Sequence, residues 1–117
     1  MKKLLKELNE GVGVRGSLVM TRDGVVAASC LGDEVDENAL AALTSSVLLA
    51  LEGSPGRDLS GEAVRFTLSA KHGRLIFEIL ESLVLVVVTD KDIQLDITLL
   101  EIAGMGRRLQ RMTRISV

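Results

Sequence analysis

Three glycines near the start of the sequence have the spacing of a dinucleotide-binding motif. Gly11, Gly13 and Gly16 match G-x-G-x-x-G, in which the backbone approaches a pyrophosphate held at the N-terminus of the following helix. That chemistry requires a strand before the glycines and a helix after them. Here MKKLLKELNE, with leucines at helical spacing, precedes the glycines, and the apolar stretch GSLVMT follows. Because the C-terminus of a helix repels phosphate, we expect these glycines to end a helix and to bind no nucleotide.

Acidic and nucleophilic side chains make a weaker case for a metal or catalytic site. Asp33, Glu34, Asp36 and Glu37 form an acidic cluster. Carboxylates at the start of a helix are favoured by the helix dipole, and cation-binding loops alternate their oxygen ligands more closely. The single histidine, His72, lies in a predicted turn, and no motif activates the nearby serine. The sequence also lacks the P-loop pattern G-x-x-x-x-G-K-[ST]. We therefore expect no enzyme activity, no metal and no cofactor.

Four arginines cluster toward the end of the sequence. A cation near the last turn of a helix stabilises it by about 0.3–1 kcal/mol, because that end of the helix dipole is negative. This structural role is sufficient to explain the arginines. The alternative is contact with an acidic partner or a membrane surface, although no exposed aromatic residues accompany them. The four are Arg107, Arg108, Arg111 and Arg114.

Composition excludes several classes of protein. The 117 residues make one domain of ordinary size, residues 1–117. The content of 47% hydrophobic and 26% charged residues excludes a disordered chain. A net charge of −2 and two phenylalanines, without tryptophan or tyrosine, argue against binding of single-stranded nucleic acid. One cysteine, Cys30, makes neither an internal disulfide nor a zinc set. The apolar run at 83–88 is too short to span a bilayer, and no segment resembles a signal peptide, so we expect a cytoplasmic protein.

The sequence predicts three helices and five strands. Asp23-Gly24 between two apolar runs indicates a hairpin, and Asp36 is placed to cap a central helix that Gly53 ends. The strand at 83–88 is apolar on both faces, which indicates the middle of a sheet. We expect a five-stranded antiparallel sheet with the central helix on one face and the two terminal helices on the other. The expected order is a helix at 1–10, strands at 16–21 and 25–29, a helix at 36–52, a loop at 53–61, strands at 63–70, 74–80 and 83–90, and a helix at 95–113.

The central helix has more apolar surface than one sheet contact needs. The helical repeat places one stripe toward the sheet and leaves Ala42 and Leu49 pointing away. The predicted stripe comprises Leu40, Leu43, Val47 and Leu51. Scattered exposed apolar residues are common, but helices that are hydrophobic all round are usually buried, so we expect the outer face to pack against a second copy. The alternating strand at 63–70 offers a further contact if it lies at a sheet edge. The expected dimer interface comprises Ala41, Ala42, Ser45, Leu48, Leu49, Arg65, Phe66 and Thr67.

Nearly the whole chain resembles the roadblock/dynein light chain domain family, in its stand-alone prokaryotic form. The hairpin GVRGSLVMTRDGVVAAS, the acidic-capped helix DENALAALTSSVLLALE, the strands in VRFTLSAKHGRLIF and the closing strand LVLVVVTD occur in the family's order. The resemblance implies a profilin-like α/β sandwich and dimers formed through the central helix and the third strand. It also implies regulation or scaffolding of small Ras-like GTPases, and it supplies no catalytic residues.

We therefore expect a non-enzymatic, homodimeric regulator or scaffold of a small Ras-like GTPase. The alternative is a structural adaptor subunit, similar to a light chain, that leaves nucleotide hydrolysis unchanged. A third class, small-molecule sensing in a profilin-like pocket, has no polar constellation to support it. Arginines can complete a GTPase site from outside, so Arg57 in the predicted loop is the first arginine to test. The residues that face the GTPase are not predicted.

Overall fold

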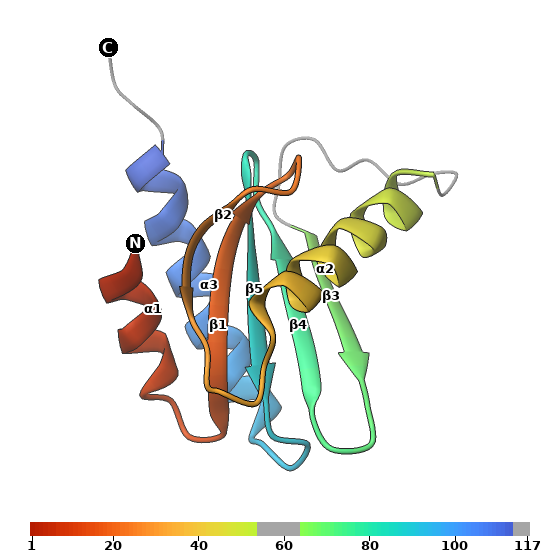
Figure 1. The fold of residues 1–117 in the computed structure, drawn as a ribbon. Coiled ribbons are helices and arrows are strands. Elements are labelled where there is room, and N and C mark those ends of the chain that lie inside the picture. The colour runs from red at the N-terminus through yellow and green to blue at the C-terminus, as the bar shows by residue number, and fades with distance from the viewer. Residues whose placement is uncertain (54–63, 114–117) are drawn as a thin grey trace.

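The computed structural model describes residues 1–53 and 64–113, and Figure 1 shows its helices and strands. Most of the loop predicted at 53–61, including Arg57, lies outside the described residues, as does Arg114. The elements are α1 (Lys2–Asn9), β1 (Val14–Thr21), β2 (Val26–Cys30), α2 (Glu37–Glu52), β3 (Val64–Ser69), β4 (Arg74–Ile79), β5 (Leu83–Thr89) and α3 (Leu95–Thr113). The predicted order of helices and strands is confirmed.

The five strands form one antiparallel sheet in the order β2-β1-β5-β4-β3. β5 lies in the middle, as its uninterrupted apolar sequence predicts, and residues 83–87 are buried. The Asp23-Gly24 turn joins β1 to β2, and Gly24 has a φ of 103°, which residues with a side chain rarely adopt. β2 and β3 are therefore the two edges of the sheet.

The helices divide between the two faces of the sheet, which confirms the predicted α/β sandwich. α1 and α3 cover one face, and α2 crosses the other (Figure 1). Successive residues of a strand point to opposite faces, so each face has its own apolar core. Phe77 and Val86 belong to the core under α2, whereas Ile76 and Leu85 belong to the core under α1 and α3.

The predicted orientation of α2 is wrong by a rotation of about 50° around the helix axis. Leu43 was expected to face the sheet but is 40% exposed, and Leu48 was expected at the dimer interface but is buried in the core. Thr44 is fully buried against the sheet, where its hydroxyl donates a 2.8 Å hydrogen bond to the carbonyl of Leu40. The hydroxyl is thus satisfied within the helix and needs no water. A pattern based on apolar residues alone left Thr44 out of the buried stripe, which is why the rotation was misjudged.

The glycines of the G-x-G-x-x-G motif connect a helix to a strand. The N–H of Gly11 donates to the carbonyl of Leu8 at the end of α1, and Gly13 has a φ of 82° before β1 begins at Val14. Gly16 lies within β1. The expected order of helix, glycines and strand is confirmed, so the spacing serves a turn and not the start of a helix.

Gly13→Ala is expected to lower the free energy of unfolding by about 1–2 kcal/mol. A side chain at a φ of 82° is strained, and the new Cβ would lie 2.3 Å from Cγ2 of Ile93. Gly32→Ala is the matched control, because the nearest atom to its Cβ would be 3.8 Å away and its φ lies outside the left-handed region. Urea unfolding of both variants measures the difference, and an equal change in the two would contradict the prediction.

Candidate interaction surface

The outer face of α2 carries no charge between Glu37 and Glu52. Between Asn38 and Glu52, the exposed residues of α2 recur at helical spacing, and all are small or apolar. We call this set the α2 face; its members are Ala39, Ala42, Leu43, Ser46, Leu49 and Ala50. Leu49 is 70% exposed. The hydroxyl of Ser46, the one polar member, donates a 3.1 Å hydrogen bond to the carbonyl of Ala42. Because the outer face of a solvent-facing helix normally carries charged residues, the α2 face is suited to packing against protein.

The two flanks of α2 face different edges of the sheet. Ser45 borders the β1–β2 turn, since its Oγ is 3.4 Å from the position that a Cβ on Gly24 would take. Helical spacing puts Leu43 and Val47 on the opposite flank, and the sheet order puts β3 at that edge. The part of the α2 face nearest the open edge of β3 is therefore apolar.

The predicted helical interface residues fall into three groups. Ala42 and Leu49 are exposed members of the α2 face, and Ala41 and Ser45 are half-buried. Leu48 is packed against the sheet and is unavailable to a second chain. Four exposed members of the α2 face were not in the predicted interface: Leu43 was placed against the sheet, Ser46 was counted only as polar, and Ala39 and Ala50 were left out.

β3 is an open edge strand, since β4 is its one partner within the described chain. Its residues alternate between half-buried positions on the α2 side and exposed positions on the other side. The two sets are Val64, Phe66 and Leu68, and Arg65, Thr67 and Ser69. On the α2 side the ring of Phe66 packs near that of Phe77, with ring centres 6.2 Å apart. The outward N–H and C=O groups of an edge strand can pair with a further strand.

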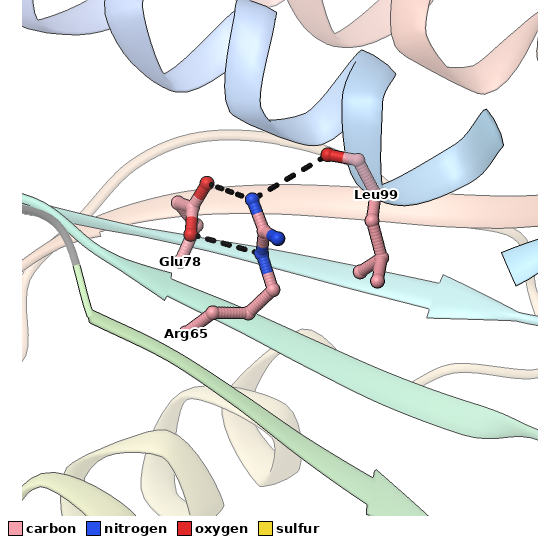
Figure 2. Close-up of polar contacts among 3 residues, drawn as sticks. All are labelled: Arg65, Glu78 and Leu99. Atoms are coloured by element: carbon pink, nitrogen blue, oxygen red, sulfur yellow. Dashed lines mark hydrogen bonds and ion pairs between the residues drawn. The ribbon is translucent and has the colours of Figure 1, made fainter. Parts of the chain in front are cut away.

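A half-buried ion pair ties β3 to its neighbours, and Figure 2 shows its geometry. Arg65 and Glu78 lie directly opposite each other in the β3–β4 register. Nε of Arg65 donates to Oε1 of Glu78 at 3.2 Å, and Nη2 donates to Oε2 at 3.0 Å. Nη2 also donates to the carbonyl of Leu99 in α3 at 3.4 Å. Glu78 is 3% exposed, so the bidentate guanidinium neutralises a carboxylate that water scarcely reaches.

Arg65 was predicted as an interface residue, whereas Glu78 was not among the predicted site residues. The structure turns the guanidinium back toward α3, so Arg65 first stabilises its own chain. A signal for the pair was available, because a hairpin closed at Lys71-His72-Gly73 sets Arg65 opposite Glu78, the one charge in the stretch 75–80.

Three of the four residues of the acidic cluster at the start of α2 make local contacts. Asp36 caps α2 by accepting from the N–H groups of Asn38 and Ala39, at 2.9 and 3.2 Å. Glu34 pairs with Arg15 at 3.2 Å, and the hydroxyl of Ser29 donates to Glu37. Over residues 1–53 and 64–113, no group of three or more Asp, Glu, His or Cys side chains is arranged to hold a metal ion.

His72 is exposed in the β3–β4 turn.

No helix within the described ranges is long and apolar enough to cross a bilayer.

Comparisons with known proteins agree with this architecture. Residues 1–89 match the family model described as the Roadblock/LC7 domain. The uncharacterized protein MJ0714 of Methanocaldococcus jannaschii is 30% identical over 111 residues, which cover 94% of this chain and 93% of that protein. The Roadblock/LC7 domain from Streptomyces avermitilis is similar with a TM-score of 0.79, at 11% identity over 98% of both chains. Myxococcus xanthus MglB is similar with a TM-score of 0.84, at 19% identity over 95% of this chain and 85% of that chain.

Proposed function

Because the chain belongs to the Roadblock/LC7 domain family, we propose that it is a non-enzymatic homodimer that binds a small Ras-like GTPase in the cytoplasm and modulates its activity. In this proposal residues 1–117 act as one domain. The observation that carries the dimer is the uncharged α2 face beside the open edge of β3. The GTPase is the partner that the family resemblance implies.

Edge-to-edge pairing of β3 with its copy would continue the sheet from one chain into the next. A two-fold axis makes this pairing antiparallel and sets one residue opposite its own copy. A pairing centred on Arg65 would set two guanidinium groups against each other, which is unfavourable. A pairing centred on Phe66 or Thr67 avoids that contact. Either register brings the two α2 helices together on one side of the continuous sheet.

The composition of the α2 face fits contact between two helices. Ala39, Ala42 and Ser46 are small, so two helix backbones can approach closely at these positions. Leu43 and Leu49 can then pack against the neighbouring helix, where burial of the surface that remains exposed contributes about 1 kcal/mol at Leu43 (40% exposed) and about 1.5 kcal/mol at Leu49 (70% exposed). A two-fold interface requires such a self-complementary surface.

Addition of the protein to a small Ras-like GTPase of the same organism is expected to change the rate of GTP hydrolysis or of nucleotide exchange. A phosphate sensor and a fluorescent nucleotide measure the two rates. Arg57→Ala tests whether that residue supplies charge to the GTPase site. Tight binding with unchanged rates would support a structural adaptor instead. Absence of binding to every Ras-like GTPase of the organism would contradict the proposal.

A further inference from the structure

The outward surface of α3 changes from apolar to basic along the helix. In its first half Ile97 is exposed beside Val12, a residue of the α1–β1 connection that is 93% exposed. In its second half Arg107, Arg108 and Arg111 are exposed. α3 and α1 lie on the face of the sheet opposite α2, so this surface is separate from the α2 face (Figure 1).

A groove follows this surface of α3. Its apolar end is a hollow of about 370 Å³ whose lining includes Val12, Ile93 and Ile97. Its arginine end is a hollow of about 540 Å³ between α1 and α3, lined by the three arginines and by three carboxylates, those of Glu7, Glu10 and Glu101. Glu101 lines both hollows, so the two adjoin.

The middle of the groove is open because α3 has a glycine there. A Cβ on Gly104 would find its nearest neighbour, Nη2 of Arg107, 3.7 Å away. With a rise of 1.5 Å per residue, the groove runs about 15 Å from Ile97 to Arg107 and about 21 Å from Ile97 to Arg111. This length suits a short helical or extended segment of another protein.

One of the three arginines is neutralised within the described residues. Nη1 of Arg108 donates to Oε2 of Glu7 at 2.8 Å. That hydrogen bond and the charge of Arg108, with a smaller contribution from Lys3, lower the pKa of Glu7 below its usual value of 4.5. Arg107 and Arg111 have no hydrogen bond or ion pair with any residue that the structure describes.

The fold accounts for Arg111 but not for Arg107. Arg111 lies in the last turn of α3, where the helix dipole favours a cation. Arg107 lies more than one turn before the end at Thr113, beyond the range of that effect. The two guanidinium groups are also four residues apart on one helix, a spacing at which like charges repel. A ligand that supplies carboxylates would relieve this repulsion.

The remaining charges of the groove favour a protein segment over a membrane surface. Glu10 and Glu101 line the hollow at the arginine end, and Asp92 and Glu101 line the apolar hollow. An anionic bilayer would press negative charge against all three carboxylates. A polypeptide can place its carboxylates at the arginine end alone and an apolar side chain at the other end.

We propose that the α3 groove binds a segment of a partner protein that carries an apolar anchor at one end and two or three carboxylates about 15–21 Å away. The apolar side chain enters the hollow beside Val12 and Ile97. The carboxylates pair with Arg107 and Arg111. This binding requires neither the dimer nor a GTPase, so it goes beyond the proposed function.

Selection from a phage-displayed library of random peptides tests the proposal on the full chain. Peptides of about 16 residues span about 24 Å as a helix, which is slightly longer than the groove. We expect enriched sequences to combine an apolar cluster with Asp or Glu, and to bind more weakly at high salt. The double variant Arg107→Glu, Arg111→Glu should bind synthetic versions of these peptides about tenfold more weakly or worse. Ile97→Ser should also weaken peptide binding, whereas Lys2→Glu with Lys71→Glu, an equal change in net charge at residues that line neither hollow of the groove, should not.

Three results would overturn the proposal. The first is a selection that enriches no peptide. The second is a set of peptides that bind the double arginine variant and the double lysine variant equally. The third is that no peptide binds, whereas vesicles of phosphatidylserine and phosphatidylcholine bind the wild-type protein and do not bind the arginine variant. That result would assign the surface to a membrane. Far-ultraviolet circular dichroism checks that every variant remains folded.

Discussion

Leu49→Asp is expected to reduce the mass of the particle in solution from twice the chain mass of 12.6 kDa to that of a single chain. Leu49 is 70% exposed within one chain, so the substitution leaves the core of the protomer intact. In the proposed dimer the new carboxylate would be buried against the neighbouring α2 without a cation, because the α2 face carries none. An unpaired buried charge costs about 3–5 kcal/mol, which weakens association by about a hundredfold or more. Size-exclusion chromatography with light scattering measures the mass.

Leu100→Asp is the matched control for this substitution. Leu100 is 73% exposed on α3, on the opposite side of the sheet, so the same change of residue at similar exposure should leave the dimer intact. A wild-type chain that is monomeric at micromolar concentration would contradict the proposed dimer. So would a Leu49→Asp variant that remains dimeric.

Much of the fold could be predicted because its signals are local. The uninterrupted apolar residues of β5 identify the central strand, and the Asp23-Gly24 turn identifies the first hairpin. Asp36 marks the start of α2 through the hydrogen bonds that it accepts. Each signal depends on residues close together in the sequence, so each could be interpreted without coordinates.

The orientation of α2 and the details of its interface were less predictable. A stripe of leucines and valine suggested one buried face, whereas the structure buries Thr44 and exposes Leu43. A threonine that satisfies its hydroxyl within the helix can be buried without leaving a polar group unpaired, and a pattern that counts only apolar residues does not include that possibility. Leu48 was therefore assigned to the interface although it belongs to the core.

The α3 groove could not be derived from local patterns. It exists because the α1–β1 connection brings Val12 beside Ile97, residues far apart in the sequence. The arginines themselves were recognised, and the helix dipole was judged sufficient for all of them. The predicted end of this helix at 113 already places Arg107 outside the last turn, and the structure adds that Arg107, unlike Arg108, has no partner among the described residues.

Arg65→Met is expected to lower the free energy of unfolding by about 3 kcal/mol. The substitution keeps an apolar stem over the sheet and removes the cation that neutralises Glu78. Glu78 is 3% exposed, so its carboxylate would remain buried without a partner. The side chain of Arg65 is 33% exposed, and water that enters in its place moderates the loss, which sets the value at the lower end of the range for broken buried pairs. Urea unfolding at one fixed protein concentration measures the change, because association also contributes to stability.

A double-mutant cycle separates the ion pair from the lost packing. Glu78→Gln removes the buried charge, so Arg65→Met combined with Glu78→Gln should be more stable than Arg65→Met alone, with an interaction energy above about 1 kcal/mol. Arg22→Met is the control for loss of an arginine, because the guanidinium of Arg22 donates to the carbonyl of Glu81 at an exposed site, at 3.1 Å, and its loss should cost about 0.5 kcal/mol or less. If Arg65→Met and Arg22→Met destabilise the protein equally, the pair does not hold β3 in place. In that case the edge strand proposed for dimer pairing depends on its apolar side alone, through residues such as Phe66.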